Sequence, residues 1–93
     1  MLAKNPTDHK ALTKKMLGKQ VLRLGIIAEL DAINLYEQLA TASTDAKISA
    51  TFLDIAQEEK THVGEFLTLL LGADKEQEHE FEAGKREVKE RSG

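Results

Sequence analysis

The 93-residue sequence contains no cysteine and no tryptophan, a single proline and few aromatic residues (4%). Without cysteine, disulfides and thiolate metal sites are both excluded. A chain this short buries a modest fraction of its surface, so it often needs a metal or a partner to be stable. We therefore expect oligomerisation, a metal bound through oxygen and nitrogen ligands, or both.

The sequence also lacks a basic excess and any long apolar run. Its formal net charge is −3, which argues against nucleic-acid binding because there is no basic footprint. No apolar segment approaches the roughly 20 residues that cross a bilayer. The N-terminus shows no basic start followed by an apolar run, as a secretory signal would. These features predict a cytoplasmic protein that binds neither nucleic acid nor membrane.

Helix-forming residues dominate, and no segment alternates with a period of two, which predicts an all-α fold in a single domain, 1–93. We expect a leader over 1–11, long helices over 12–42 and 45–71, and a short helix or tail over 74–91. The link between the long helices is short, so they should form an antiparallel hairpin. The third segment has a sparse apolar stripe and is expected to be docked or frayed.

Turn and capping signals set these boundaries. Ser43 or Thr44 is expected to cap the second helix, with Asp45 in its first turn. Gly72 is expected to end that helix. Asp74, followed by Gln77 three residues later, resembles a capping box for the third segment.

Carboxylates interrupt the apolar faces of both predicted long helices. On the second helix, the face centred on Glu59 is apolar except for Glu59 and His62, which are three residues apart and point the same way. On the first helix, Glu29 is the only ionised group on an otherwise apolar face. An ionised carboxylate in such surroundings is costly unless something compensates its charge. A cation shared between the two helices is the economical explanation.

The residue types narrow the identity of that cation and the number of chains needed. Carboxylates with an imidazole suit iron, manganese or zinc better than calcium or magnesium. Di-metal four-helix bundles use a Glu from each of two helices and a Glu-x-x-His from each of the other two. This chain carries half of that set, so two copies related by a twofold axis would complete it. A second stripe on the first helix also needs more protein to cover it: Leu17, Val21, Leu24, Ala28, Leu35, Leu39 and Ala42.

Other interpretations remain open at this point. Glu59 and His62 could simply satisfy each other in a metal-free dimerisation module, where buried polar groups fix the register. The chain could also bind zinc or manganese without redox turnover. Glu58 lies four residues before His62 and could replace Glu59, although it is about 100° away from the centre of the stripe.

Further polar and small residues are assigned less specific roles. Glu37 and Glu65 are expected to be solvated, and the same holds for two further histidines, His9 and His79. Gly18 and Gly25 fall on the Glu29 face, where each costs about 1 kcal/mol relative to Ala. They indicate close helix approach, room for a partner side chain, or tolerated imperfection.

The segments AELDAINLYEQ (28–38) and EEKTH (58–62) resemble the encapsulated ferritins in order and spacing, within a similarity that covers roughly residues 20–72. The resemblance implies two-helix hairpins with a short C-terminal helix, which pair into a ferritin-like four-helix bundle and commonly form a ring of five dimers. It implies ferroxidase activity, in which two Fe(II) ions at a di-iron centre shared by two subunits are oxidised by dioxygen to Fe(III).

The family's functional residues carry over onto specific positions of this sequence. The metal ligands fall on Glu29, Glu59 and His62, and Tyr36 matches an aromatic residue beside the site. Asp31 matches an acidic position thought to help the metal reach the centre, although Ala28 stands where some relatives have a second acidic residue. The resemblance further implies iron storage inside an encapsulin nanocompartment, which family members reach through a C-terminal targeting peptide or by fusion to the shell protein.

Overall fold

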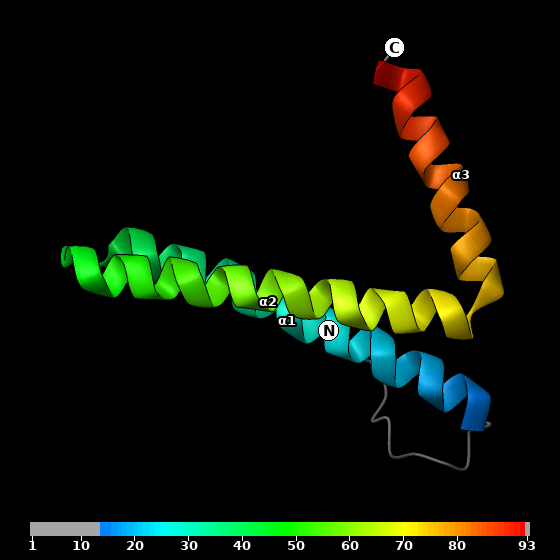
Figure 1. Ribbon diagram of the computed structural model, residues 1–93, viewed down its shortest axis with the longest axis horizontal. Coiled ribbons are helices and arrows are strands. Elements are labelled where there is room, and N and C mark those ends of the chain that lie inside the picture. Colours follow the sequence, from blue (N-terminus) through cyan, green and yellow to red (C-terminus); the bar gives the residue numbers. More distant parts are fainter. Residues whose placement is uncertain (1–13, 93) are drawn as a thin grey trace.

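A computed structural model of the chain describes residues 14–92, which form three α-helices and no strand (Figure 1). The helices are α1 (Lys14–Ala42), α2 (Ala46–Ala73) and α3 (Lys75–Ser92). Helices α1 and α2 lie side by side and antiparallel (Figure 1), so the predicted all-α fold with a helical hairpin is confirmed. The expected leader, 1–11, and the first two residues of the helix predicted over 12–42 lie outside the described residues.

The turn between α1 and α2 is closed by Asp45, which caps α2. Its backbone is extended (φ −94°, ψ 121°), and its carboxylate accepts hydrogen bonds from the N–H groups of Lys47 at 2.8 Å and Ile48 at 3.2 Å. The prediction that Ser43 or Thr44 would cap α2 was therefore wrong. The hydroxyl of Ser43 instead accepts a hydrogen bond from the Asp45 N–H at 3.1 Å. A carboxylate at this position can accept hydrogen bonds from two otherwise unpaired N–H groups. Its negative charge also interacts favourably with the positive end of the helix dipole.

The predicted end of α2 at Gly72 was also wrong, because Gly72 is helical and α2 continues to Ala73. None of the described glycines has the positive φ that a glycine stop would use. The helix ends at Asp74, whose extended backbone (φ −130°, ψ 95°) breaks the helical path. The N–H of Asp74 donates to the carbonyl oxygen of Leu70 at 2.8 Å and so closes the last turn.

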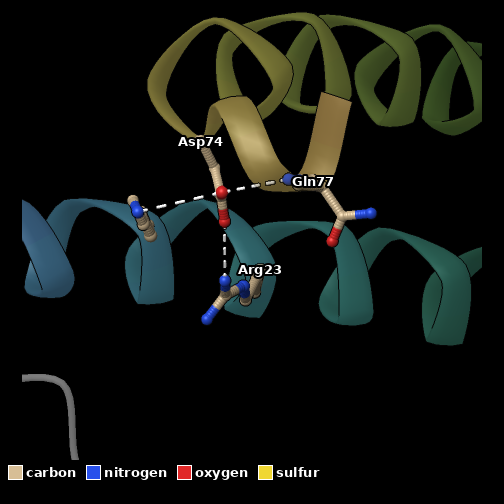
Figure 2. Close-up of polar contacts among 4 residues, drawn as sticks. Arg23, Asp74 and Gln77 are labelled. Atoms are coloured by element: carbon tan, nitrogen blue, oxygen red, sulfur yellow. Dashed lines mark hydrogen bonds and ion pairs between the residues drawn. The ribbon is translucent and has the colours of Figure 1, made fainter. Parts of the chain in front are cut away.

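Asp74 lies between α2 and α3, and its side chain contacts both α1 and α3 (Figure 2). Its Oδ1 accepts a hydrogen bond from the Gln77 N–H at 3.0 Å, the cap predicted for α3. Its Oδ2 accepts one from Arg23 at 2.9 Å, and Lys19 lies 3.8 Å from Oδ1. Asp74 is 5% exposed. The hydrogen bond from Gln77, together with the charges of Lys19 and Arg23, lowers the pKa of Asp74 against the opposing effect of burial.

Helix α3 leaves the junction and extends away from the hairpin (Figure 1). The segment predicted to be docked or frayed is therefore a continuous helix that does not pack along α1 or α2. Its stability as a helix is favoured by acidic residues in its first turn (Glu76 and Glu78) and basic residues in its last turn (Lys89 and Arg91), which complement the helix dipole.

Few apolar side chains are buried in one copy of the hairpin. The buried apolar residues of the described chain are Ile33, Ala40, Ala56 and Leu70. The second apolar stripe predicted on α1 stays largely uncovered: Val21 and Leu35 are each 50% exposed, and Leu39 is 38% exposed. One hairpin therefore leaves much of its apolar surface in contact with water. In the part of the chain described, no helix combines the length and apolar character needed to cross a membrane.

Candidate metal centre

Three metal-binding side chains converge between α1 and α2. Helix α1 provides Glu29, and α2 provides Glu59 and His62, with one potential ligand atom from each lying within 4.8 Å of the other two. The Nδ1 atom of His62 lies 3.1 Å from Oε2 of Glu29 and 3.4 Å from Oε1 of Glu59. Within residues 14–92, no other three His, Asp or Glu side chains meet in this way.

Helical geometry explains this convergence. Residues three apart share a helix face, so Glu59 and His62 project together from α2. Their face and the Glu29 face are those that pack in the hairpin, as shown by buried Ile33 on α1 and buried Ala56 on α2. The carboxylate side chains are sheltered, at 19% exposure for Glu29 and 18% for Glu59, whereas His62 is 45% exposed. The cluster is therefore enclosed by its own hairpin on one side and accessible on the side of His62.

The short distances between the three groups shift the pKa of each of them. The hydrogen bond with Glu59, and then the one with His62, lower the pKa of Glu29. The hydrogen bond with Glu29, burial and the Glu29 charge raise the pKa of Glu59. The hydrogen bond to Glu29 also raises the pKa of His62. Because two carboxylates this close resist ionising together, the cluster favours holding protons when nothing else balances its charge.

A metal ion could take the place of those protons. Two carboxylates and one imidazole form an oxygen- and nitrogen-rich donor set, which suits iron, manganese and zinc. Three protein ligands leave coordination positions open for other groups. The donor set therefore fits one side of a transition-metal centre, and the exposed edge of His62 is where further ligands would approach.

The other predicted site residues lie outside this cluster. Tyr36 is half-buried and stacks on Phe52, with ring centroids 6.0 Å apart and planes inclined by 27°. Asp31 is exposed, two residues beyond Glu29 and so on a different face of α1. Glu58, the alternative to Glu59, is also exposed and is not one of the three converging residues.

The remaining polar residues considered from sequence have ordinary surface positions. Glu37 pairs with Lys60 across the hairpin at 3.3 Å, and both side chains are largely exposed. Glu65 is exposed, as is His79, whose Nε2 lies 3.7 Å from Glu80. His9 lies outside the described residues.

Sequence reasoning did not anticipate the ion pairs of Asp74 with Lys19 and Arg23 on α1. A signal was present, because Lys19 and Arg23 are four residues apart and therefore share a face of the first helix. Their partner could not be identified until the path of the chain after α2 was known.

Comparison with known proteins gives consistent matches. The family model described as rubrerythrin matches residues 20–92. The chain is 54% identical over 96 residues to a ferritin-like–encapsulin shell fusion protein of Pyrococcus furiosus, covering 100% of this chain and 28% of that protein. It is 40% identical over 60 residues to the encapsulin nanocompartment cargo protein EncB of Myxococcus xanthus, covering 64% of this chain and 38% of EncB.

A solved structure matches the fold as a whole. The crystal structure of the encapsulated ferritin domain from Pyrococcus furiosus aligns with a TM-score of 0.82 and 51% sequence identity. The alignment covers 97% of this chain and 94% of the solved chain. The chain thus corresponds to nearly the whole of that domain, while it spans 28% and 38% of the two curated relatives.

Proposed function

Because this chain belongs to the rubrerythrin family and has the fold of an encapsulated ferritin domain, we propose that it is one half of a ferroxidase. In this proposal, two copies pair so that Glu29, Glu59 and His62 of both subunits surround two iron ions. The iron is the substrate: it binds as Fe(II) and leaves as Fe(III). The resulting homodimer assembles further into a ring such as a decamer.

The observation that carries this proposal is the convergence of Glu29, Glu59 and His62 within one hairpin. Two carboxylates and an imidazole make up half of the ligand set of ferritin-like di-iron bundles. A twofold axis beside the exposed edge of His62 would bring an identical half-set from a second copy. Neither copy alone would supply enough negative charge and ligands for two iron ions.

The uncovered apolar surface supports pairing independently of the ligands. Val21, Leu35 and Leu39 on α1 remain exposed in one hairpin. Burial of apolar surface contributes roughly 25 cal/mol for each Å² removed from water, so covering this stripe would favour association. Two hairpins packed together would form a four-helix bundle, the architecture in which such metal sites are built.

The protein groups would act by binding and by changing protonation. Fe(II) binding requires deprotonated carboxylates and a neutral ligating nitrogen, so the cluster would release the protons that it otherwise holds. Two Fe(II) ions supply two electrons to dioxygen, which with two protons gives hydrogen peroxide, and each iron becomes Fe(III). The four carboxylates of two subunits favour Fe(III), whose extra positive charge they help to balance.

Residues around the centre have supporting roles in this proposal. Tyr36 stacks on Phe52 two helical turns after Glu29 on α1, and in the assembled dimer it would limit the access of water from that end of the bundle. Asp31 is exposed and would attract cations toward the assembled dimer. Glu65 is an exposed acidic residue on α2 whose negative charge acts on His62 without ligating.

The relatives suggest where the oxidised iron goes. One is a ferritin-like domain fused to an encapsulin shell, and the other is an encapsulin cargo protein. A subunit of this size encloses no space for a mineral, so we propose that it works with an encapsulin shell protein. In this arrangement the nanocompartment would store the iron that the ferroxidase oxidises.

Fe(II)-dependent oxygen uptake tests the proposal. The wild-type protein should consume oxygen, and the rate should be lower in Glu29→Ala by a factor of at least roughly 10 to 100. Loss of a supporting group at a metal site already costs that much. Glu58→Ala is the matched control, since it removes an exposed carboxylate from α2 and should retain the wild-type rate.

Two results would refute ferroxidase activity, and a third would refute the ligand assignment. Wild-type protein that binds zinc or manganese but consumes no oxygen with Fe(II) would be a metal protein without redox turnover. Wild-type protein that binds no metal would be a dimerisation module. Full oxygen uptake by Glu29→Ala would remove Glu29 from the centre.

A further inference from the structure

Gly25 lies where α1 meets the ring of Phe66 on α2. A Cβ atom placed at Gly25 would lie 3.3 Å from both Cδ2 and Cε2 of Phe66 and 3.7 Å from its Cγ. The other glycines of the described helices, Gly18, Gly64, Gly72 and Gly84, would have nothing within 4 Å of such an atom. Among the described glycines, Gly25 is thus the one at which a neighbouring side chain lies against the space that a Cβ would occupy.

The contact lies one helical turn from the metal-binding cluster. Gly25 precedes Glu29 by four residues on α1, and Phe66 follows His62 by four residues on α2. Residues four apart lie one above the other on a helix face, separated by about 6 Å along the axis. Because the two helices are antiparallel, the Gly25–Phe66 contact and the Glu29–His62 contact of 3.1 Å are adjacent steps of the same helix packing.

We propose that Gly25 is a positioning residue for the metal centre: it lets Phe66 lie against α1 and so keeps Glu29 within reach of His62. A side chain at position 25 would force Phe66 or α1 to retreat, because contacts of 3.3 Å to a Cβ are already tight. The retreat would be transmitted through one turn of two rigid helices. The expected effect of this retreat on metal binding rests on the proposed function, whereas the expected effect on the Glu29–His62 distance does not.

The three ligands should move by different amounts when a side chain is introduced at position 25. Glu59 and His62 share one helix, so their separation should survive a widening of the hairpin. Glu29 is carried by the opposite helix, so it should be drawn away from both. A wider hairpin would therefore leave the α2 half of the cluster intact and detach the α1 ligand.

Crystal structures of the metal-free full chain test the geometry directly. Gly25→Ala and Gly25→Val form a series of increasing side-chain size, and Gly18→Ala with Gly18→Val is the matched series, two turns earlier in α1 where the space is open. The distance from Glu29 Oε2 to His62 Nδ1 should grow by a few tenths of an ångström in Gly25→Ala and beyond hydrogen-bonding range in Gly25→Val. It should stay near 3.1 Å in the Gly18 series.

Cobalt(II) binding provides the second measurement, because this ion is redox-stable here and its visible absorption reports coordination. Each variant is titrated at a temperature where circular dichroism shows it fully folded. Affinity should fall about tenfold or more in Gly25→Val, as it does when supporting residues of metal sites are lost. The absorption spectrum should change with it, while Gly18→Val keeps wild-type affinity and spectrum.

A compensating variant separates positioning from general damage to the fold. Phe66→Leu removes the ring that a side chain at position 25 would meet, so Gly25→Ala combined with Phe66→Leu should recover the short Glu29–His62 distance and the cobalt affinity of Phe66→Leu alone. An unchanged distance in both Gly25 variants would overturn the inference, as would a loss of affinity that Phe66→Leu fails to rescue. Absence of cobalt and iron binding by the wild-type protein would refute the proposed function, and the crystallographic distances would still decide the role of Gly25.

Discussion

Arg23 on α1 donates a hydrogen bond to Asp74, 51 residues later in the chain, with a donor–acceptor distance of 2.9 Å. The other carboxylate oxygen of Asp74 accepts from the Gln77 N–H and caps α3. The backbone N–H of the same residue closes α2. One side chain thus connects the direction of α3 to the packing of the hairpin, through charge and hydrogen bonds at a site with little exposure.

The charge of Asp74 should make stability depend on pH. The pKa of Asp74 is lowered in the folded protein, so its stabilisation is complete above the ordinary Asp pKa of about 4 and is lost as the pH falls through the folded-state value. Asp74→Asn keeps a capping oxygen but has no charge. Wild type should therefore be more stable than Asp74→Asn at pH 7, and the difference between the two melting temperatures should shrink as the pH falls below about 4.

Thermal unfolding followed by circular dichroism between pH 3 and pH 7 measures this difference. Glu29, Glu59 and His62 also titrate, but they are present in both proteins and their effect cancels in the comparison. A gap between wild type and Asp74→Asn that stayed constant with pH would show that the charge of Asp74 contributes nothing to stability.

Removal of either α2 ligand should abolish high-occupancy iron binding. Glu59→Ala and His62→Ala each delete two ligands from a centre shared by two subunits, one from each copy. Iron content after loading, measured by elemental analysis of the purified protein, should drop to background for both. Glu58→Ala provides the control and should bind close to the wild-type amount. If Glu58→Ala were the more severe change, the assignment of Glu59 would be wrong.

Metal binding and assembly should be linked. Without metal, carboxylates of two subunits would face each other across the twofold axis and repel or take up protons. A metal that binds the assembled form and not the separated subunits favours assembly by mass action. Light scattering of chelator-treated protein titrated with Zn(II) should show a rise in mass that is absent from Glu59→Ala. A mass distribution that does not respond to metal at any protein concentration argues against a centre at an interface.

The cap of α2 gives a prediction for stability alone. Asp45 accepts hydrogen bonds from two N–H groups at the start of α2, so Asp45→Ala should lower the free energy of unfolding by about 1 kcal/mol. Thr44→Ala is the control, because Thr44 is the neighbouring residue that the sequence also offered as a cap. Urea unfolding of both variants measures the difference. Equal losses would mean that the capping role is shared, not held by Asp45.

The convergence of Glu29, Glu59 and His62 could be predicted because it depends on helix periodicity. Each residue's angular position follows from its number once a continuous helix is assumed, and the short turn between the helices forces the two carboxylate-bearing faces together. Close helix approach at Gly25 was one of three interpretations that the sequence left open. The ring of Phe66, which fills the space beside Gly25, could not be identified from sequence.

The helix ends were less predictable because several neighbouring residues had competing capacities. Ser43, Thr44 and Asp45 can all cap a helix, and the backbone angles of the turn decided in favour of Asp45. Gly72 is a common stop, yet it can also continue a helix, and Asp74 supplied a stronger end two residues later. The direction of α3 depends on contacts between Asp74 and α1 that are distant in sequence.

Helix α3 buries none of its residues within one copy of the chain. Its amides should therefore exchange with solvent deuterium at rates set by opening of this helix alone, while those of the hairpin are retained longer. Any neighbour that packs on α3 in an assembly would slow exchange there first. Deuterium uptake by residues 75–92 thus reports on contacts between subunits, and it can be measured in solution without changing the cluster between α1 and α2.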